Sequence, residues 1–370
     1  MEEKKVDFLI VGAGIAGTTL ALELMKRGKS ICIYDEPNPN SSSRVAAGIL
    51  NPVVPKGITI TWNIEHLFPH VFNYYKHWEI VLDGQFIESR NFITLHKNPD
   101  ELKQWEKRYN HDTMSHWIES FSSPSWLNKD INFGASNTKN AGRLNVCRFL
   151  ELAKSYLMQH GTIWINENLP LNQNNNSESS LFDDLRLKNI KYQFIVFCQG
   201  VNGKNNPLFP DLFYDPTGGD ILTVSIPELD PKNMYKRGLW LVPAENDTWL
   251  IGSNFIKGEN IDKAQNKDAE QLLSQIQSWI PFEVKLIAHR RGIRPTVQNR
   301  RPYLGKSPLQ GMSHCYIFNG LGSKGSSLCT WLSPMLANHL CTGAPLDPEV
   351  DVSRFYTENH TPNNIIRQMH

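Results

Sequence analysis

The sequence lacks the marks of a membrane-spanning protein, a zinc protein and a disulfide-rich protein. No apolar run reaches the length of a membrane-spanning helix, about 20 residues. The six cysteines are scattered with no CxxC pair among them, so we expect reduced thiols and no metal site. The charged first residues lead directly into an apolar stretch, from which we expect no secretory leader and a cytoplasmic protein.

The chain also has no excess of charge of either sign. Lysine and arginine number 38 and aspartate and glutamate 37, which gives a net charge of +1 over 370 residues. Such a balance provides no broad positive field for a nucleic acid or for an anionic membrane. A chain of this length can form two domains, each with its own core.

The most informative pattern lies near the start of the chain. Residues 6–11 are an apolar run of the kind found in a strand that is buried on both faces of a parallel sheet. They are followed by the spacing GxGxxG, in Gly12, Ala13, Gly14, Ile15, Ala16 and Gly17. The first two glycines allow a sharp turn close to a ligand. The third lets the next helix lie close to the strand, so that a pyrophosphate can bind at the helix N-terminus.

A second apolar strand ends in Asp35. This carboxylate lies about 20 residues beyond the glycines, where the dinucleotide fold places an acid on the ribose hydroxyls. Strand, glycines, helix, strand and acid in this order predict a dinucleotide-binding unit. The alternative is a glycine turn that binds no ligand.

Three later segments carry small residues. One contains Arg44, Ala46, Ala47 and Gly48, and a helix-packing face and a flat ligand such as a flavin ring explain it equally well. An apolar run at 192–200 ends in Gly200, which predicts another strand of the parallel sheet with its end at the cofactor edge. A turn near the C-terminus precedes a helix and contains Gly320, Gly322, Ser323, Lys324 and Gly325.

Together these segments resemble the D-amino-acid-oxidase-type flavoproteins, which include glycine oxidase, the sarcosine oxidases and a tRNA-uridine methylaminomethyl oxidase domain. Residues 6–35 are similar to the family's dinucleotide-binding start, and residues 43–50 to its small-residue segment beside the flavin. Further family motifs follow in the family's order at 197–200, 216–222, 292–305 and 319–325. The resemblance covers most of the chain.

The resemblance implies an α/β fold in which a Rossmann-type FAD-binding domain is interleaved with an α+β substrate domain that contains an antiparallel sheet. We expect the FAD-binding domain at 1–75, 140–215 and 290–370, and the substrate domain at 76–139 and 216–289. The implied cofactor is FAD, bound by the residues named above. A helix that starts at Gly325 presents free N–H groups to the flavin's pyrimidine edge. Lys324 would add positive charge there, or is simply solvated.

The resemblance also implies the substrate-binding residues. Arg294 would hold a substrate carboxylate, because the planar guanidinium suits two parallel hydrogen bonds. The alternative is a structural arginine paired with an acid. Tyr235 and Trp240 align with two active-site tyrosines of glycine oxidase, and a further arginine of that enzyme aligns with Ser323. Because the indole of Trp240 cannot replace the phenol's hydrogen bond, these departures weaken a prediction of glycine as the substrate.

The implied function is FAD-dependent oxidation of a C–N bond in an amino acid or secondary amine, by hydride transfer to the flavin. The expected partner is a small molecule, with no membrane. Two alternatives stay open. The segment Gly322-Ser323-Lys324-Gly325 is similar to the tRNA-uridine oxidase domain, whose substrate is a glycine-like group on a tRNA base. The other alternative is a catalytically silent FAD-binding protein.

Overall fold

The structure is a computed structural model that describes residues 3–54, 57–111, 113–169, 186–187, 189–259 and 261–356. The chain forms two compact units, each made of segments that are far apart in the sequence. Unit 1 comprises Met1–Ser43, Leu150–Pro216 and Arg294–His370, and unit 2 comprises Arg44–Phe149 and Thr217–Ile293. Among the described residues, none of the helices combines the length and the apolar character needed to cross a membrane.

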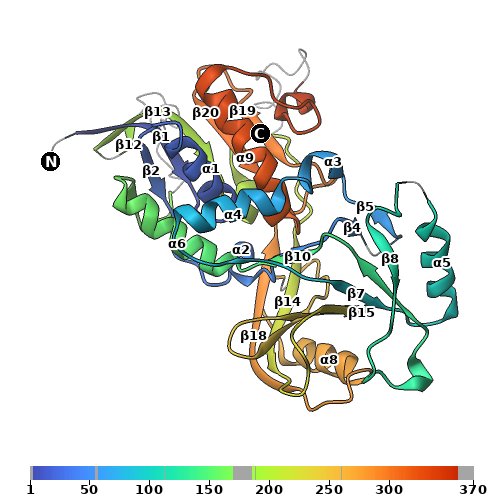
Figure 1. Cartoon of the computed structure of the whole chain (residues 1–370). Helices are drawn as coiled ribbons and strands as arrows, with labels where there is room; N and C mark the ends of the chain where they lie inside the picture. The colour runs from blue at the N-terminus through green and yellow to red at the C-terminus, as the bar shows by residue number, and fades with distance from the viewer. Residues whose placement is uncertain are drawn as a thin grey trace. The chain divides into compact units, whose positions relative to one another are not determined.

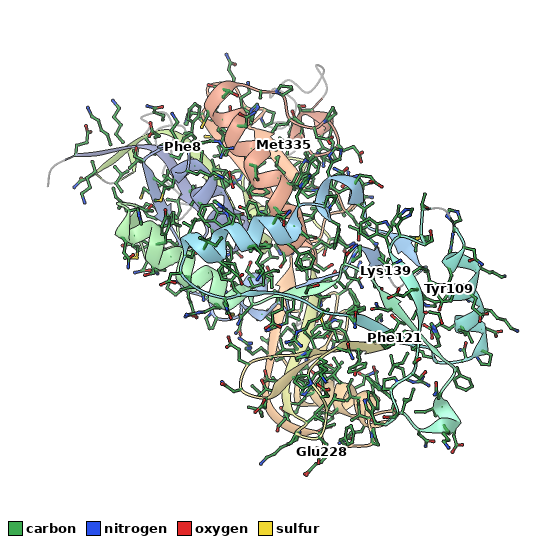
Figure 2. All side chains as sticks on the ribbon, in the orientation of Figure 1. Phe8, Tyr109, Phe121, Lys139, Glu228 and Met335 are labelled. Atoms are coloured by element: carbon green, nitrogen blue, oxygen red, sulfur yellow. The ribbon has the colours of Figure 1, made fainter. Side chains whose placement is uncertain are left out.

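Unit 1 is built on a mainly parallel sheet (Figure 1). Its strands lie in the order β11 (Ile163–Ile165), β2 (Ile31–Tyr34), β1 (Lys4–Val11), β13 (Ile190–Phe197), β20 (Cys315–Asn319) and β19 (Tyr303–Lys306). The first five run parallel, β19 is antiparallel to β20, and β12 (Arg186–Leu187) pairs antiparallel with β13. Phe8 on β1, labelled in Figure 2, is 2% exposed. Its ring stacks on that of Phe194 of β13, at 5.4 Å between the ring centroids.

Two helices pack together in unit 1. Helix α1 (Ile15–Met25) follows β1, and α9 (Gly325–Thr342) follows β20. The hydroxyls of Thr19 and Ser333 meet at 2.7 Å in their buried interface. Gly343, with φ of 75°, ends α9 in the left-handed conformation that glycine adopts readily. The described part of this unit also contains the short 3-10 helices η2 (Gly200–Asn205) and η3 (Val352–Phe355). Helix α6 (Val146–Gln159) belongs to unit 1 from Leu150 onward.

Unit 2 is built on an eight-stranded, mainly antiparallel sheet. The order is β18 (Lys285–Arg294), β14 (Thr217–Ser225), β17 (Thr248–Gly252), β16 (Leu239–Pro243), β15 (Met234–Arg237), β7 (Phe92–Leu95), β9 (Ala135–Thr138) and β8 (Ile118–Phe121). Strands β15 and β7 are parallel. Helix α8 (Asn266–Gln277) packs its apolar side on one face of this sheet, where Leu272 and Ile276 join a core with Leu222 and Leu241.

Smaller elements complete the described part of unit 2. A three-stranded sheet has the order β3 (Ile49–Leu50), β10 (Gly142–Leu144) and β6 (Ile87–Ser89), and β4 (Val53–Val54) pairs with β5 (Thr59–Ile60). The helices are α2 (Ser42–Val45), α3 (Ile64–Leu67), α4 (Val71–Val81), α5 (Pro99–Tyr109) and η1 (Lys129–Ile131). Helix α5 begins at Pro99 because the Asn98 side chain accepts a hydrogen bond from the Glu101 N–H and Pro99 needs no donor there.

The predicted α/β fold class, with a parallel sheet and a second, antiparallel sheet, is confirmed. The two units divide the chain differently from the predicted domains at residues 44–75, 140–149, 216 and 290–293. Val45 and Ala47 show one reason, because they pack against Ile221 and Leu250 of the antiparallel sheet. The predicted domain boundaries stay a prediction.

Candidate cofactor and substrate sites

The glycine turn between β1 and α1 has no room for side chains at two positions. Gly12 has φ of +98°, and a Cβ there would lie 2.5 Å from the Cys198 carbonyl oxygen. A Cβ on Gly17 would lie 1.9 Å from the carbonyl oxygen of Gly12 itself. At Gly14 the closest atom to a Cβ would be Ser43 Oγ, at 3.0 Å. The turn therefore brings strand, helix and neighbouring strand as close as their backbones allow.

Asp35 lies at the end of β2 beside this turn. One of its carboxylate oxygens, Oδ1, accepts a hydrogen bond from the Ala13 N–H at 2.8 Å, which fixes the carboxylate next to the glycines. The Ile15 N–H, at the start of α1, donates to Ser43 Oγ at 3.0 Å. This contact of Ser43 was missed from the sequence, because the two residues are 28 positions apart and no periodic pattern links them.

Asn319 joins two of the predicted cofactor segments. Its Nδ2 donates to the Gly200 carbonyl at 2.9 Å, and its Oδ1 accepts from the Gly320 N–H at 2.8 Å. Gly200 and Gly320 have φ of +57° and +77°, so both turns use conformations that favour glycine. The sequence contains Asn319 at the head of the last glycine-rich turn, but nothing in the sequence reveals that it holds the end of β13.

The start of α9 reaches the start of α1. A Cβ on Gly325 would lie 2.9 Å from Ile15 Cγ2, so this glycine, too, permits a close approach. Lys324 precedes the helix, and burial, with a smaller contribution from the charge of Arg300, lowers its pKa to about 8. Ser323 is exposed. The structure thus brings the first and last predicted cofactor segments together within unit 1.

Unit 2 contains the other predicted cofactor segment. A Cβ on Gly48 would lie 1.8 Å from the Leu144 carbonyl oxygen, so the protein's own backbone already explains the glycine there. Ala47 is 5% exposed and packs in unit 2, whereas Ala46 is exposed. The Arg44 carbonyl accepts a hydrogen bond from Cys147 Sγ at 3.1 Å. Close packing therefore accounts for Ala47 and Gly48, while the exposed Ala46 lacks this explanation.

The structure separates Tyr235 from Trp240. In the β15–β16 hairpin Tyr235 is opposite Leu241 and Lys236 is opposite Trp240, so Tyr235 and Trp240 point to different faces of the sheet. Tyr235 is 3% exposed, and its ring lies 5.3 Å from that of Trp126 in the core under α8. The half-buried Trp240 lies over Gly252, where a Cβ would be 2.6 Å from its ring. A ligand on the Trp240 face does not meet Tyr235.

The predicted carboxylate-binding residue, Arg294, is half-buried and ends strand β18. Earlier on this strand Arg291 donates to both carboxylate oxygens of the fully buried Asp220, at 2.9 and 2.7 Å, and His289 Nε2 lies 2.8 Å from the same carboxylate. Burial opposes ionisation of Asp220, but hydrogen bonds from Arg291, Asn254 and His289 hold its pKa below the usual value. This network fixes β18 against β14 three residues before Arg294.

Comparison with known families agrees with this arrangement. The family model described as FAD dependent oxidoreductase (DAO) matches residues 7–339. The chain belongs to this family. The bifunctional protein of tRNA 5-methylaminomethyl-2-thiouridine biosynthesis from Vibrio cholerae is 20% identical over 389 residues, which are 94% of this chain and 57% of that protein. Its counterpart from Leptospira interrogans is 24% identical over 402 residues, 94% of this chain and 59% of that protein. The chain therefore spans less than two thirds of these relatives.

Two solved structures of oxidases share the fold. Glycine oxidase from Geobacillus kaustophilus superposes with a TM-score of 0.76 at 17% identity, over 97% of this chain and 100% of that chain. Iminodiacetate oxidase from Chelativorans sp. BNC1 superposes with a TM-score of 0.74 at 17% identity, over 94% of this chain and 98% of that chain. The predicted family and the predicted cofactor, FAD, are thereby confirmed.

The described residues of unit 1 fit an FAD oxidoreductase. At Gly12 and Gly17 the neighbouring backbone leaves no room for a side chain, so β1, α1 and the end of the next strand approach one another as closely as a dinucleotide-binding turn requires. The residues at the helix N-caps, Gly14 for α1 and Lys324 for α9, form no side-chain capping hydrogen bond. Two helix N-termini with positive partial charge suit the pyrophosphate and an electron-accepting ring.

Proposed function

We propose that this FAD oxidoreductase oxidises the C–N bond of a small amine that carries a carboxylate. The observation that carries the proposal is the half-buried Arg294 at the end of β18, within the sequence Gly292-Ile293-Arg294-Pro295-Thr296 that resembles the family's carboxylate-binding motif. Two proteins of similar fold are a glycine oxidase and an iminodiacetate oxidase, and both names denote amines with carboxylates.

In this proposal the chain's residues position the substrate and exclude water. The Arg294 guanidinium binds the carboxylate through two parallel hydrogen bonds, which fixes the distance and direction of the neighbouring amine. Bound FAD supplies the acceptor for the hydride that leaves the carbon beside the nitrogen. An amine that arrives neutral needs no strong base, so positioning and desolvation are the protein's main contributions.

The proposal also assigns roles to the cofactor-binding residues. The N-terminus of α1 would bind the pyrophosphate through the helix dipole and the Ala16 N–H, because the Ile15 N–H is already donated to Ser43 Oγ. Asp35 would bind the ribose hydroxyls. The N-terminus of α9 and Lys324 would supply positive charge to the electron-accepting ring of the flavin. Tyr235 is left out of the proposed substrate site, because it lies in the core under α8.

The test is to replace Arg294 and to measure reduction of bound FAD by absorbance under nitrogen. Arg294→Ala should lower kcat/KM for amino-carboxylates by about 2–4 kcal/mol of transition-state binding, or roughly 30- to 1,000-fold. Arg294→Lys should recover part of this loss, because it keeps the charge but not the planar fork. FAD content and Tm should stay at wild-type values in both variants.

A matched control is Arg301→Ala, which removes an arginine that forms an ion pair with Glu349 at 2.8 Å. It should leave reduction by amino-carboxylates unchanged. Amines that lack a carboxylate should be poor substrates and indifferent to Arg294→Ala. If amines with and without a carboxylate lose activity equally, Arg294 supports the fold and does not bind the carboxylate.

A second candidate is oxidation of a glycine-like group on a tRNA base. The two relatives reported above, both proteins of tRNA thiouridine biosynthesis, favour it, although the balanced net charge of +1 offers little for a broad tRNA surface. The same assay distinguishes the candidates if small amino-carboxylates and bulk tRNA are offered separately. Reduction of FAD by tRNA alone would favour the second candidate over the first.

A further inference from the structure

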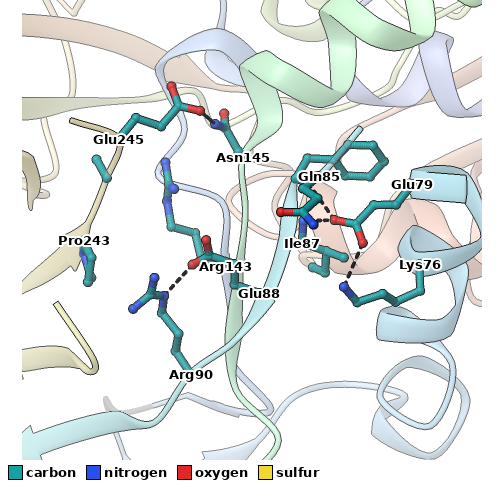
Figure 3. Close-up of a pocket in the computed structure, with 12 residues that line it drawn as sticks. Lys76, Glu79, Gln85, Ile87, Glu88, Arg90, Arg143, Asn145, Pro243 and Glu245 are labelled. Atoms are coloured by element: carbon teal, nitrogen blue, oxygen red, sulfur yellow. Dashed lines mark hydrogen bonds and ion pairs between the residues drawn. The ribbon is translucent and has the colours of Figure 1, made fainter. Parts of the chain in front are cut away.

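Unit 2 contains a charged pocket that none of the predicted cofactor or substrate residues lines. It has a volume of about 280 Å³. Its walls come from β10 and the residue that follows it, from β6, from α4 and from the residues at the end of β16 (Figure 3). We call it the Arg143 pocket, because Arg143 of β10 lies in it, with Glu88 and Arg90 nearby on one side and Asn145 and Glu245 on the other.

Most charged groups around this pocket already have partners in the protein. Lys76 Nζ lies 2.7 Å from Glu79 Oε2. The other carboxylate oxygen of Glu79 accepts hydrogen bonds from the N–H groups of Phe86 and Ile87, at the start of β6. Arg90 Nε donates to Glu88 at 2.5 Å, and Asn145 Nδ2 donates to Glu245 at 2.7 Å. These pairs hold the walls in place without the help of a ligand.

Arg143 differs from its neighbours. Its Nε is buried and has no hydrogen-bond partner among the described residues. Burial lowers the pKa of Arg143, while the charges of Glu88 and Glu245 partly oppose this effect. A guanidinium remains charged in proteins, and a buried donor without an acceptor is costly. The unmet donor therefore needs an acceptor that is not among the described residues, and a molecule bound in the pocket would supply one.

The charges around the pocket restrict the nature of that acceptor. Lys76, Arg90 and Arg143 are cationic, and Glu79, Glu88 and Glu245 are anionic, so the formal charges of the walls cancel. A phosphate with two negative charges would be attracted by Arg143 but repelled by the nearby carboxylates of the walls. A molecule with one carboxylate and one ammonium group complements both signs. Its carboxylate suits the fork of Arg143, and its ammonium suits Glu88 or Glu245.

We propose that the Arg143 pocket is a binding site for a small zwitterionic amino-carboxylate. This binding site is separate from the site of the proposed oxidation, because no residue of the pocket is assigned a part in that reaction. The binding proposal therefore does not rest on the proposed function. The molecule bound here is held and not oxidised. Its carboxylate accepts hydrogen bonds from Arg143, including one from Nε, which has no acceptor among the described residues.

The test is calorimetric titration of the FAD-loaded protein with β-alanine, which carries one carboxylate and one ammonium group. Propionate, ethylamine and inorganic phosphate serve as probes that lack one group or add charge. Arg143→Gln should weaken β-alanine binding by at least about tenfold, because a charged bidentate contact is lost. Arg143→Lys should weaken it less. Propionate, ethylamine and phosphate should all bind the wild type more weakly than β-alanine does.

Two further variants separate this site from others. Arg148→Gln removes an exposed arginine of α6, five residues further along the chain, and should bind β-alanine like the wild type. Arg294→Gln removes the residue proposed for the oxidation site and should leave binding at the Arg143 pocket intact. The inference is overturned if Arg143→Gln binds β-alanine with wild-type affinity, if phosphate binds more tightly than β-alanine, or if Arg294→Gln abolishes the binding. A failure of Arg294 to affect oxidation would overturn the proposed function alone.

Discussion

Replacing Gly17 by alanine tests how the dinucleotide turn works. The added Cβ would lie 1.9 Å from the Gly12 carbonyl oxygen and 3.2 Å from Ile10 Cγ2. Because the first of these atoms belongs to the backbone, no side-chain rotation relieves the clash. Helix α1 must move away from β1 by roughly 1 Å or more to restore an ordinary contact. Such overpacking costs about 1–3 kcal/mol of unfolding free energy.

The displacement also moves the N–H groups that are proposed to bind the pyrophosphate. We expect Gly17→Ala to raise the Kd for FAD by at least about tenfold, measured by titrating FAD-free protein with FAD and following flavin fluorescence. Gly28→Ala is the matched control, because Gly28 lies just beyond the C-terminal end of α1, has φ of +72° and leaves open space within 4 Å of the position that a Cβ would take. It should lower Tm through backbone strain alone and keep wild-type FAD affinity. Wild-type FAD affinity in Gly17→Ala would refute the reasoning.

Two further predictions concern charged residues of unit 1. Asp35→Ala should raise the Kd for FAD by about ten- to a hundredfold, because a hydrogen bond to a charged acceptor is worth about 1.5–3 kcal/mol, and an unchanged Kd in the same titration would contradict a ribose contact. The pKa of Lys324 is about 8 in the folded protein and roughly 10.4 in the unfolded chain. Between these two pH values the unfolded chain binds more protons than the folded protein. The free energy of unfolding of the wild type therefore rises with pH across this interval. Lys324→Met should therefore raise Tm of FAD-free protein near neutral pH by roughly 1–2 °C, about 1 kcal/mol after solvent screening, and this gain should vanish above about pH 10.5. The exposed Lys306→Met should show no such pH-dependent gain, and a pH-independent gain in Lys324→Met would contradict the assignment.

The start of the chain was predictable because its signals are local. The strand, the glycine spacing and the helix lie within residues 4–25, and each depends on its own short segment. The steric need for Gly12 and Gly17 follows directly from this spacing, and the structure agrees with it at both positions. The later motifs occur in the same order as in the family, and this order led to the prediction of the α/β fold and of FAD as the cofactor.

Contacts between distant segments were not predictable in the same way. Ser43 accepts a hydrogen bond from Ile15, and Asn319 donates one to Gly200, yet neither pair leaves a periodic trace in the sequence. Gly48 illustrates a different difficulty. A small residue marks close approach, but the sequence cannot say whether the approaching group is a ligand or, as here, the Leu144 carbonyl.

Hairpin geometry explains the separation of Tyr235 from Trp240. The two residues are five positions apart with Gly238 between them, at φ of +80°. Which face each side chain takes depends on where the turn falls, since a shift of one residue in register moves a side chain to the other face. The observed register places Tyr235 with Leu241 and Trp240 with Lys236. Alignment with a relative supplies residue positions but not this register.

The alternation of side chains along a strand also distinguishes Arg291 from Arg294 on β18. Arg291 faces α8, because its guanidinium binds Asp220 and also Asp268 of that helix, at 2.5 Å. Asp220 is fully buried and needs this cation, so a substitution of Arg291 would leave a buried charge without its strongest partner. Arg294 lies three residues further along the strand, and alternation directs it to the opposite face. Arg291 is therefore a structural arginine paired with an acid, which was the alternative role considered for Arg294. The carboxylate-binding role of Arg294 stays a prediction.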